Sequence, residues 1–243
     1  MPNRESSQPG KGDWAEAAHE LRRPLGVAQG YLTMLLEGHL GSLADAQRRA
    51  LLRIQSKLAE TQNQLEQQVL QGRLDADAVA PALRRLDLVE VAESAIERAQ
   101  PRIELAGGSL RFEPPQFGVP AIADSVLLAR ILDNLLDNAI TYADGTPQVS
   151  VRVGLADGPF LRICDGGVGM DPALRERIFA RGFRANPGGG RPGSGLGLYL
   201  SRRAAQLMGA SLWVEWTQQG EGSCFRLDLK GPQDDLPGQM ALG

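Results

Sequence analysis

One short stretch of the chain sets an imidazole beside a carboxylate. The sequence AHELRRPL contains His19 and, directly after it, Glu20, and His19 is one of only two histidines in 243 residues. The other histidine, His39, has no acidic residue directly beside it. Histidine gains and loses its proton near neutral pH and is a frequent reacting group. His19 is therefore either a surface residue of a helix or the group on which the chain acts.

A second set of candidate residues lies in ILDNLLDNAITYA. Asn134 and Asn138 are four residues apart, which places them on one face of a helix. Their amide oxygens are hard, neutral donors that suit a Mg²⁺ ion bridging phosphates. Asparagines at this spacing are also common as solvated or backbone-bonded residues, so the pair alone does not decide for a metal.

Two glycine-rich stretches follow. In ICDGGVGMD, Asp165 ends an apolar strand pattern, and its carboxylate could accept a hydrogen bond from an exocyclic amine such as that of adenine. A plain loop with a capping aspartate fits equally well. Farther on, the glycines between 188 and 197 precede an amphipathic helix, an arrangement in which backbone N–H groups hold phosphate. Because no repeated βαβ units surround it, this stretch is a flexible lid rather than a Rossmann fingerprint.

The elements that must position these residues fall into two regions. From Trp14 to about Val69, apolar residues recur in steps of three and four, which predicts two helices joined near Gly38 and Gly41, with Ser42 capping the second. Two helices alone cannot enclose a core, so the hairpin is expected to form a dimeric four-helix bundle with a second copy of the chain. The alternative is a hairpin that packs on the rest of its own chain.

The second region mixes helices and strands. Helical patterns cover 88–101 and 125–143, and residues 149–155 alternate before an Asp157-Gly158 turn into PFLRIC. Leu212, Val214 and Trp216 alternate ahead of SCFRLDLK. This order predicts an α+β sandwich with helices on one face of the sheet. Predicted boundaries are a disordered N-terminus at 1–12, the hairpin at 13–72, a linker at 73–86, the sandwich at 87–230 and a disordered tail at 231–243.

Composition excludes several classes of protein. The net charge of −3 gives no general affinity for nucleic acid, and the longest apolar run is far short of a membrane span. The N-terminus lacks a signal peptide, so a cytoplasmic protein without direct membrane insertion is expected. Cys164 and Cys224 are too few for a disulfide framework and are predicted to be reduced, buried residues.

Taken in order, these stretches resemble the motifs of two-component sensor histidine kinases over residues 13 to 230. HELRRPL resembles the phosphoacceptor box, NLLDNA the N box, DGGVG and GSGLGL the two glycine boxes, and IFARGFR the F box. The resemblance implies a dimerisation and histidine phosphotransfer domain followed by an ATP-binding domain of the histidine kinase/Hsp90/gyrase type.

The resemblance also implies roles for individual residues. His19 is expected to attack the γ-phosphate of ATP, with Glu20 orienting its imidazole, and Pro24 distorts the helix enough for that contact. Asn138 is the expected Mg²⁺ ligand and Asp165 the adenine-binding group. The remaining cofactor-binding residues are expected to be Asn134, Tyr142, Gly167, Gly169, Arg184, Gly193, Gly195 and Gly197.

The chain departs from the family pattern at three places. Thr141 replaces a lysine of the N box, so Arg184 is the first candidate and Arg181 the second to neutralise the charge of the phosphates. Gly182 replaces an aromatic residue of the F box, so Phe179 and Phe183 must anchor a looser lid. Arg23 stands where the family has a Thr or Asn that positions water for dephosphorylation of the partner, which predicts either weak phosphatase activity or a phosphatase that works by another arrangement.

The expected function is ATP-dependent autophosphorylation of His19 and phosphoryl transfer to an aspartate of a response regulator receiver domain. The expected partners are a second copy of the chain and this receiver, with a separate sensor protein as a further candidate. Two alternatives remain. A degenerate kinase would bind ATP and a receiver without transfer, and an ATPase of the same fold would release phosphate. Asn134 occupies the position of the water-activating Glu of such ATPases, which argues against the second.

Overall fold

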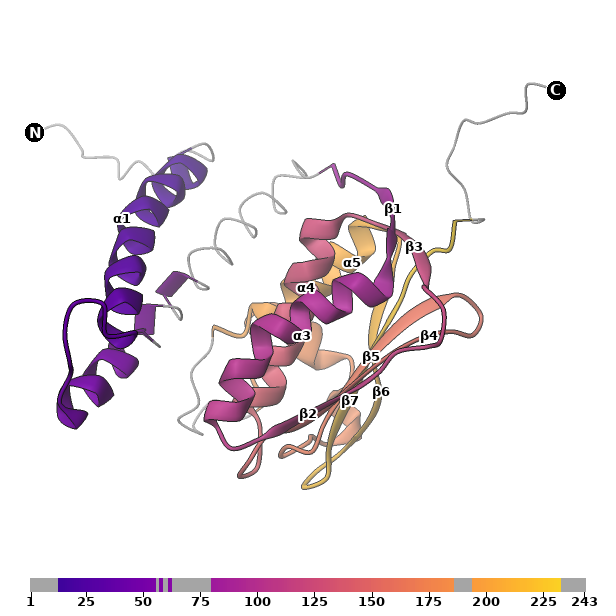
Figure 1. The fold of residues 1–243 in the computed structure, drawn as a ribbon. Coiled ribbons are helices and arrows are strands. Elements are labelled where there is room, and N and C mark those ends of the chain that lie inside the picture. The colour runs from indigo at the N-terminus through magenta and orange to yellow at the C-terminus, as the bar shows by residue number, and fades with distance from the viewer. Residues whose placement is uncertain (1–12, 56, 59–60, 63–79, 186–193, 233–243) are drawn as a thin grey trace, which may run out of the picture. The chain divides into compact units, whose positions relative to one another are not determined.

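The structure is a computed structural model that describes residues 13–55, 57–58, 61–62, 80–185 and 194–232, with only the backbone at 13–22 (Figure 1). The chain divides into two compact units, Met1–Val79 and Ala80–Gly243. No helix in the described part is both long enough and apolar enough to cross a membrane. Each unit is described separately below.

The first unit contains a helical hairpin. Helix α1 spans Asp13–Leu36 with Pro24 inside it, and residues 45–55, 57–58 and 61–62 are helical. Gly38 has a φ of 82°, a left-handed conformation that favours glycine and ends α1.

The prediction that Ser42 caps the second helix is wrong. Ala44 occupies the cap position, because its carbonyl accepts from the Arg48 N–H at 2.9 Å and its own N–H donates to Gln47 Oε1.

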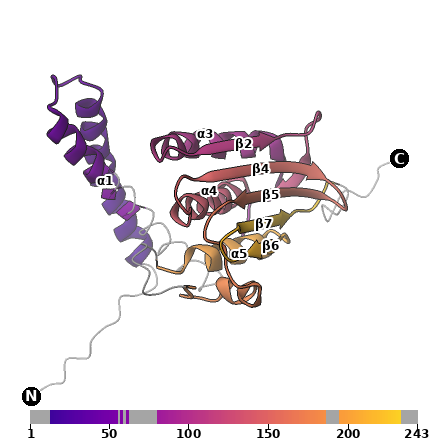
Figure 2. The same cartoon turned by 90° about the horizontal axis from the view of Figure 1, so that it is seen from below.

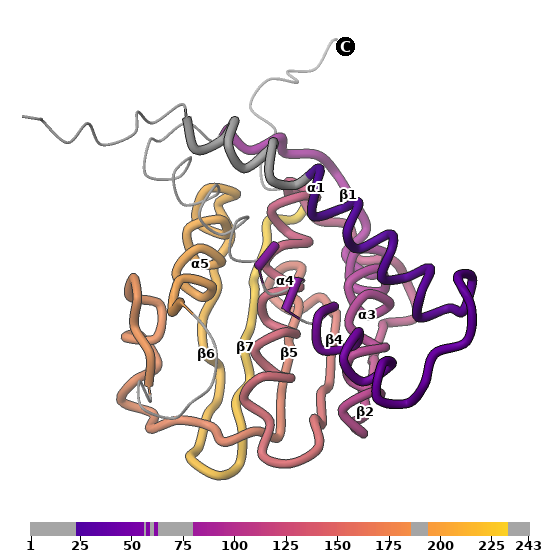
Figure 3. Tube along the Cα trace, turned by 90° about the vertical axis from the view of Figure 1, so that its left-hand side faces the viewer, coloured from indigo at the N-terminus to yellow at the C-terminus, as the bar shows by residue number. Residues whose placement is uncertain are grey.

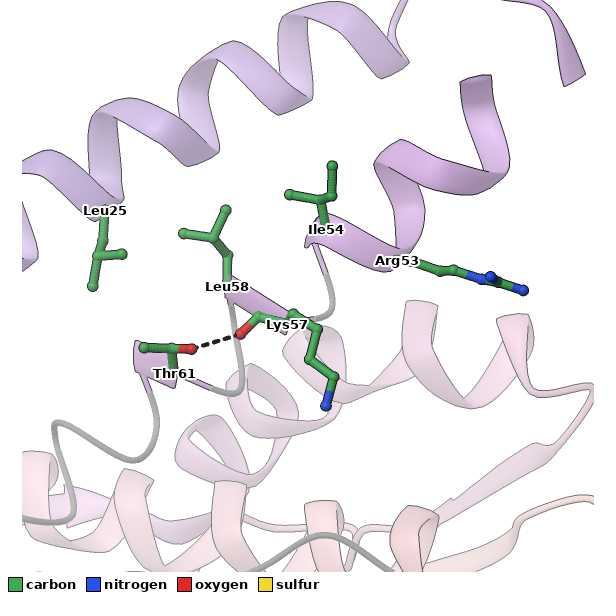
Figure 4. Close-up of a pocket in the computed structure, with 6 residues that line it drawn as sticks. All are labelled: Leu25, Arg53, Ile54, Lys57, Leu58 and Thr61. Atoms are coloured by element: carbon green, nitrogen blue, oxygen red, sulfur yellow. Dashed lines mark hydrogen bonds between the residues drawn. The ribbon is translucent and has the colours of Figure 1, made fainter. Parts of the chain in front are cut away.

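An apolar groove runs between the two helices of the hairpin (Figure 4). Leu25 of α1 faces Ile54 and Leu58 of the second helix across it. Its remaining lining residues are Arg53, Lys57 and Thr61. Leu32 of α1 is buried, but Ile54 is 50% exposed in the single chain. The hairpin thus leaves part of its apolar surface uncovered.

The second unit is built on a five-stranded sheet in the order β2-β4-β5-β7-β6 (Figure 2). β2 (Ser109–Glu113) pairs in parallel with β4 (Gln148–Leu155), and all other neighbours are antiparallel. The remaining strands are β5 (Pro159–Asp165), β6 (Ser211–Gln218) and β7 (Gly222–Asp228). A separate two-stranded sheet joins β1 (Arg84–Asp87) to β3 (Pro120–Ala123). β1 occupies the end of the predicted linker.

Three helices cover one face of the large sheet, as predicted (Figure 3). They are α3 (Leu88–Leu105), α4 (Ser125–Thr141) and α5 (Gly197–Leu207). α4 is central, and its apolar face is almost entirely buried: Leu127, Leu128, Ile131, Leu132, Leu135, Leu136 and Ala139. Each large aliphatic side chain contributes about 1.5–3 kcal/mol on such burial, so α4 forms the centre of the core and holds the N box in place.

Aspartates fix where two of these helices begin. Asp87 Oδ1 accepts from the Val89 N–H at 2.9 Å at the start of α3, and Asp124 Oδ1 accepts from the Val126 N–H at 2.9 Å at the start of α4. Such caps contribute about 1 kcal/mol each. α3 continues past its predicted end at Pro101 to Leu105, because the next turn buries Ile103 completely. Two short 3-10 helices, η1 (Pro172–Leu174) and η2 (Arg177–Phe179), precede α5.

The prediction for the two cysteines is wrong. Cys164 of β5 and Cys224 of β7 lie directly opposite each other, their Cα atoms are 4.0 Å apart, and their sulfur atoms are bonded. Both side chains are half-buried on the sheet face away from the helices, since Ile163 and Phe225 beside them point into the core. Strand register, which the sequence pattern did not resolve, brings them together.

Candidate nucleotide and phosphotransfer sites

The first candidate site residue ends strand β5. Asp165 is half-buried, and its Oδ1 accepts a hydrogen bond from the Gly167 N–H at 2.9 Å. Burial raises the pKa of this carboxyl above its ordinary value of 3.8, and backbone N–H groups of Gly167 and Ser223 partly offset that rise. The carboxylate keeps unused lone pairs, so it can accept a further hydrogen bond from a ligand amine.

The glycines after Asp165 are required by close backbone packing. A Cβ on Gly167 would overlap the Tyr142 carbonyl oxygen, and one on Gly169 would overlap the Gln218 carbonyl oxygen. Gly169 also has a φ of 56°, a conformation that side chains rarely adopt. Because neither glycine has a Cβ, the loop can pack closely against the end of α4 and the end of β6.

The end of α4 meets this same loop. Tyr142 caps α4 through its N–H, which donates to the Asn138 carbonyl at 2.9 Å, and its own carbonyl accepts from the Val168 N–H at 3.0 Å. Asn138 Nδ2 is buried and has no hydrogen-bond partner among the described residues. A buried amide without a partner is costly. Because the two ends of an amide differ only by assignment, the Asn138 side chain suits either a phosphate oxygen or a cation.

Asn134 has a different environment from Asn138. Its Nδ2 donates to the hydroxyl of Ser201 in α5 at 3.0 Å, and a Cβ on Gly197 would collide with its amide oxygen. Ser201 is itself buried. Asn134 thus ties the N box to the N-terminal part of α5, which begins within the second glycine box.

The F box packs on α5 and β7. Phe179 is buried, its ring meets Phe225 edge-on at 6.5 Å, and the Arg202 guanidinium lies 4.3 Å from its centroid. Arg202 also binds Glu176 at 2.7 Å, which lowers the pKa of that carboxyl. Phe183 is half-buried, with the Arg177 guanidinium 5.2 Å from its ring.

Backbone contacts join the F box to the second glycine box. The Gly182 N–H donates to the Gly195 carbonyl at 3.2 Å, and a Cβ on Gly195 would lie 2.8 Å from the Phe183 carbonyl oxygen. Gly182 has a φ of 71°, which explains a glycine where the family pattern has an aromatic residue. Arg184 is half-buried after it. Gly193 lies outside the described residues.

The structure brings four predicted segments of the second unit into one connected site: the N box, both glycine boxes and the F box. Sequence reasoning missed the polar residues behind the first glycine box. The buried Thr217 hydroxyl lies 2.8 Å from the Ser223 hydroxyl and accepts from the Met170 N–H at 3.1 Å. Only strand register could have placed Ser223 opposite Asp165.

The histidine candidates lie in the first unit. His19 and Glu20 fall within α1, and their side chains are outside the described residues. His39 lies in the interhelical turn and has no acidic residue directly beside it in the sequence, but in the structure it pairs with Glu37, two residues earlier. Its Nε2 is 3.2 Å from Glu37 Oε2, although both side chains are more than half exposed. Such a surface pair contributes little.

Comparison with known proteins assigns the family. Residues 14–77 match the His Kinase A (phospho-acceptor) domain, and residues 123–233 match the Histidine kinase-, DNA gyrase B-, and HSP90-like ATPase family. The solved Mycobacterial sensor histidine kinase MprB is 31% identical, with a TM-score of 0.52, over 61% of this chain and 97% of that chain. The chain belongs to the sensor histidine kinases.

Other relatives of this histidine kinase are longer. Sensor histidine kinase MtrB of Mycolicibacterium paratuberculosis is 32% identical over 88% of this chain and 38% of its own length. Sensor-like histidine kinase SenX3 of Mycobacterium bovis is 29% identical over 88% of this chain and 52% of its own. Full-length ShkA in complex with AMPPNP shares the fold, with a TM-score of 0.65 at 24% identity over 89% of this chain and 45% of that one. The kinase spans about two fifths of the length of MtrB.

Proposed function

We propose that the chain transfers the γ-phosphate of ATP to His19 and then to an aspartate of a response regulator receiver domain. The observation that carries the proposal is the connected site around Asp165 and Asn138, in a chain whose residues 14–77 match a phosphoacceptor domain. In the first step the bond between the γ-phosphorus and its bridging oxygen breaks. A bond from phosphorus to an imidazole nitrogen of His19 forms, ADP leaves, and the imidazole N–H proton is released.

The nucleotide site supplies recognition and charge neutralisation. Asp165 accepts a hydrogen bond from the adenine amine, and Gly167 and Gly169 let the loop approach the base. Gly193, Gly195 and Gly197 offer backbone N–H groups to the phosphates, and Arg184 with Tyr142 completes the contacts. Asn138 fits a Mg²⁺ ion because its buried side-chain nitrogen has no hydrogen-bond partner in the described part of the chain, and the nitrogen and oxygen of the amide differ only by assignment. Mg²⁺ bound to phosphates needs only one or two protein ligands, and it would neutralise charge on the transferring group.

Glu20 is proposed to hold the tautomer of His19 that presents a free lone pair. Asn134 supports the phosphate site through α5, because its amide is bonded to Ser201. We also propose that the protein is cytoplasmic. For its domains we propose the bounds 13–72 for the helical hairpin, 73–86 for the linker and 87–230 for the ATP-binding sandwich.

Incubation with γ-labelled ATP and Mg²⁺ tests the proposal. The wild type is expected to gain acid-labile label, and His19→Gln is expected to lose it. His39→Gln is the matched control, because it removes the chain's other histidine and should leave labelling intact. Nucleotide binding without label would support the degenerate module, and release of free phosphate without label would support an ATPase.

A further inference from the structure

We propose that Cys164 and Cys224 form a redox modification site that controls nucleotide affinity, an inference that rests on the proposed ATP site. The two residues face each other on adjacent antiparallel strands with Cα atoms 4.0 Å apart. Opposite side chains approach most closely in the non-hydrogen-bonded pairs of an antiparallel ladder, whose Cα atoms are about 4.5 Å apart, and these two Cα atoms are closer still. The strand pairing therefore holds the two sulfur atoms within reach of each other.

The sheet itself separates the two cysteines from the proposed nucleotide site. Both cysteines are half-buried, and they lie on the sheet face opposite the helices because Ile163 and Phe225 beside them are buried in the core. Side chains alternate along a strand, so Asp165, the residue after Cys164, lies on the helix side together with Ile163. A redox reagent and a nucleotide would thus act on opposite faces of the same two strands.

Each cysteine is adjacent to a residue that supports the glycine loop. Asp165 follows Cys164 and accepts from the Gly167 N–H. Ser223 precedes Cys224, pairs with Asp165 in the strand register, and contacts Thr217, which accepts from the Met170 N–H at 3.1 Å. The crosslink therefore fixes the two strand positions that hold both ends of the loop from Gly167 to Met170.

The disulfide also closes the segment that carries most of the site. The bonded cysteines are 60 residues apart, and both glycine boxes and the F box lie between them. A crosslink between the two ends of this segment reduces the number of conformations that it can adopt without nucleotide, so less conformational entropy is lost on binding. The oxidised protein is therefore expected to bind nucleotide more tightly than the reduced protein.

The chemical step is thiol–disulfide exchange with a small-molecule disulfide. One cysteine thiolate attacks a sulfur of glutathione disulfide, a mixed disulfide forms, and one glutathione thiolate leaves. The second cysteine then attacks the protein-side sulfur and expels the second glutathione. In total the two protein thiols lose two electrons and two protons. Glutathione disulfide takes up these electrons and protons and becomes two molecules of reduced glutathione. In a reducing compartment the pair would be a dithiol at rest, so oxidation would be the signal.

The test measures affinity for a nonhydrolysable ATP analogue with Mg²⁺ by calorimetry, using the full chain in oxidised and in reduced glutathione. Alkylation and mass spectrometry report the state of the cysteines. Oxidation is expected to lower Kd by about fivefold or more, the lower end of typical couplings between sites. By reciprocity, saturating nucleotide should then make the disulfide harder to reduce by the same factor, which for fivefold is about 20 mV.

The double variant Cys164→Ser/Cys224→Ser is the matched control, because serine keeps the size of the side chain and cannot form the bond. It should bind like the reduced wild type in both buffers. Equal affinity of oxidised and reduced wild type, or thiols that stay free in glutathione disulfide, would overturn the inference. If the variant does not fold, the wild-type titration alone decides. Loss of binding in both states would instead count against the proposed nucleotide site.

Discussion

At the scale of single residues, the proposed nucleotide site is expected to depend on one carboxylate. Asp165 is half-buried at the end of β5, and backbone N–H groups of Gly167 and Ser223 partly offset the cost of burying its charge. Asp165→Asn keeps the size of the side chain but removes its charge. Hydrogen bonds to charged groups contribute about 1.5–3 kcal/mol, so ATP affinity should fall about ten- to hundredfold, measured by calorimetry. Unchanged affinity would show that another group binds the base.

The raised pKa of Asp165 predicts how binding responds to pH. The carboxylate accepts a hydrogen bond only when it is deprotonated, so affinity should weaken as pH falls through the folded-state pKa, which lies above 3.8. Stability responds in the opposite sense. Burial penalises the charged form, so the contribution of Asp165 to stability declines as pH rises from 3.8 through that raised pKa. Calorimetry across acidic pH checks the first effect, and Asp165→Asn should flatten the profile.

We expect Arg23 to affect the dephosphorylation of the receiver rather than the autophosphorylation of His19. Its side chain is exposed on α1 four residues after His19, and a guanidinium cannot act as a base to activate water. The wild type should therefore dephosphorylate its receiver slowly, and Arg23→Thr should increase that rate while autophosphorylation continues. Release of phosphate from a labelled receiver measures both proteins. Rapid dephosphorylation by the wild type would contradict this prediction.

At the scale of elements, the spacing of apolar residues predicted helices and strands, but it did not predict how the strands pair. Apolar residues that repeat every three to four positions along 125–143 correctly predicted the helix that carries Asn134 and Asn138. Alternation along 149–155 predicted a strand for the same kind of reason. Pairing between strands has no such local signal, which is why the contact of Cys164 with Cys224 was missed. A register shift between Val214 and Trp216 similarly leaves Trp216 39% exposed despite its place in the alternation.

The contact between α4 and α5 carries a prediction of its own. Gly197→Ala would press a methyl group into the Asn134 amide that bonds Ser201. Overpacking of this kind costs about 1–3 kcal/mol, so the second unit should melt earlier and bind ATP more weakly. Gly26→Ala is the matched control, since Gly26 is also helical but has no atom within 4 Å of an added Cβ. Calorimetric melting of both variants distinguishes the site-specific effect from a general one.

At the scale of the whole molecule, the helical hairpin is the element that lacks a complete core. Its groove exposes Ile54 to 50%, and Leu25 and Leu58 line the same surface. Two helices bury too little apolar area to be stable alone, whereas four enclose a core. We therefore expect two copies of the chain to pack through their hairpins.

Ile54→Glu tests this expectation, because it places a charge on the surface that the second copy would bury. An unpaired buried charge is strongly unfavourable, so sedimentation should show a dimer for the wild type and a monomer for the variant at the same concentration. Arg49→Glu introduces the same side chain at an exposed position outside the groove and should stay dimeric. If Ile54→Glu also remained a dimer, the groove would not be the interface. Because the second unit of each chain has its own core, the monomeric variant should still bind ATP, which separates dimerisation from nucleotide recognition.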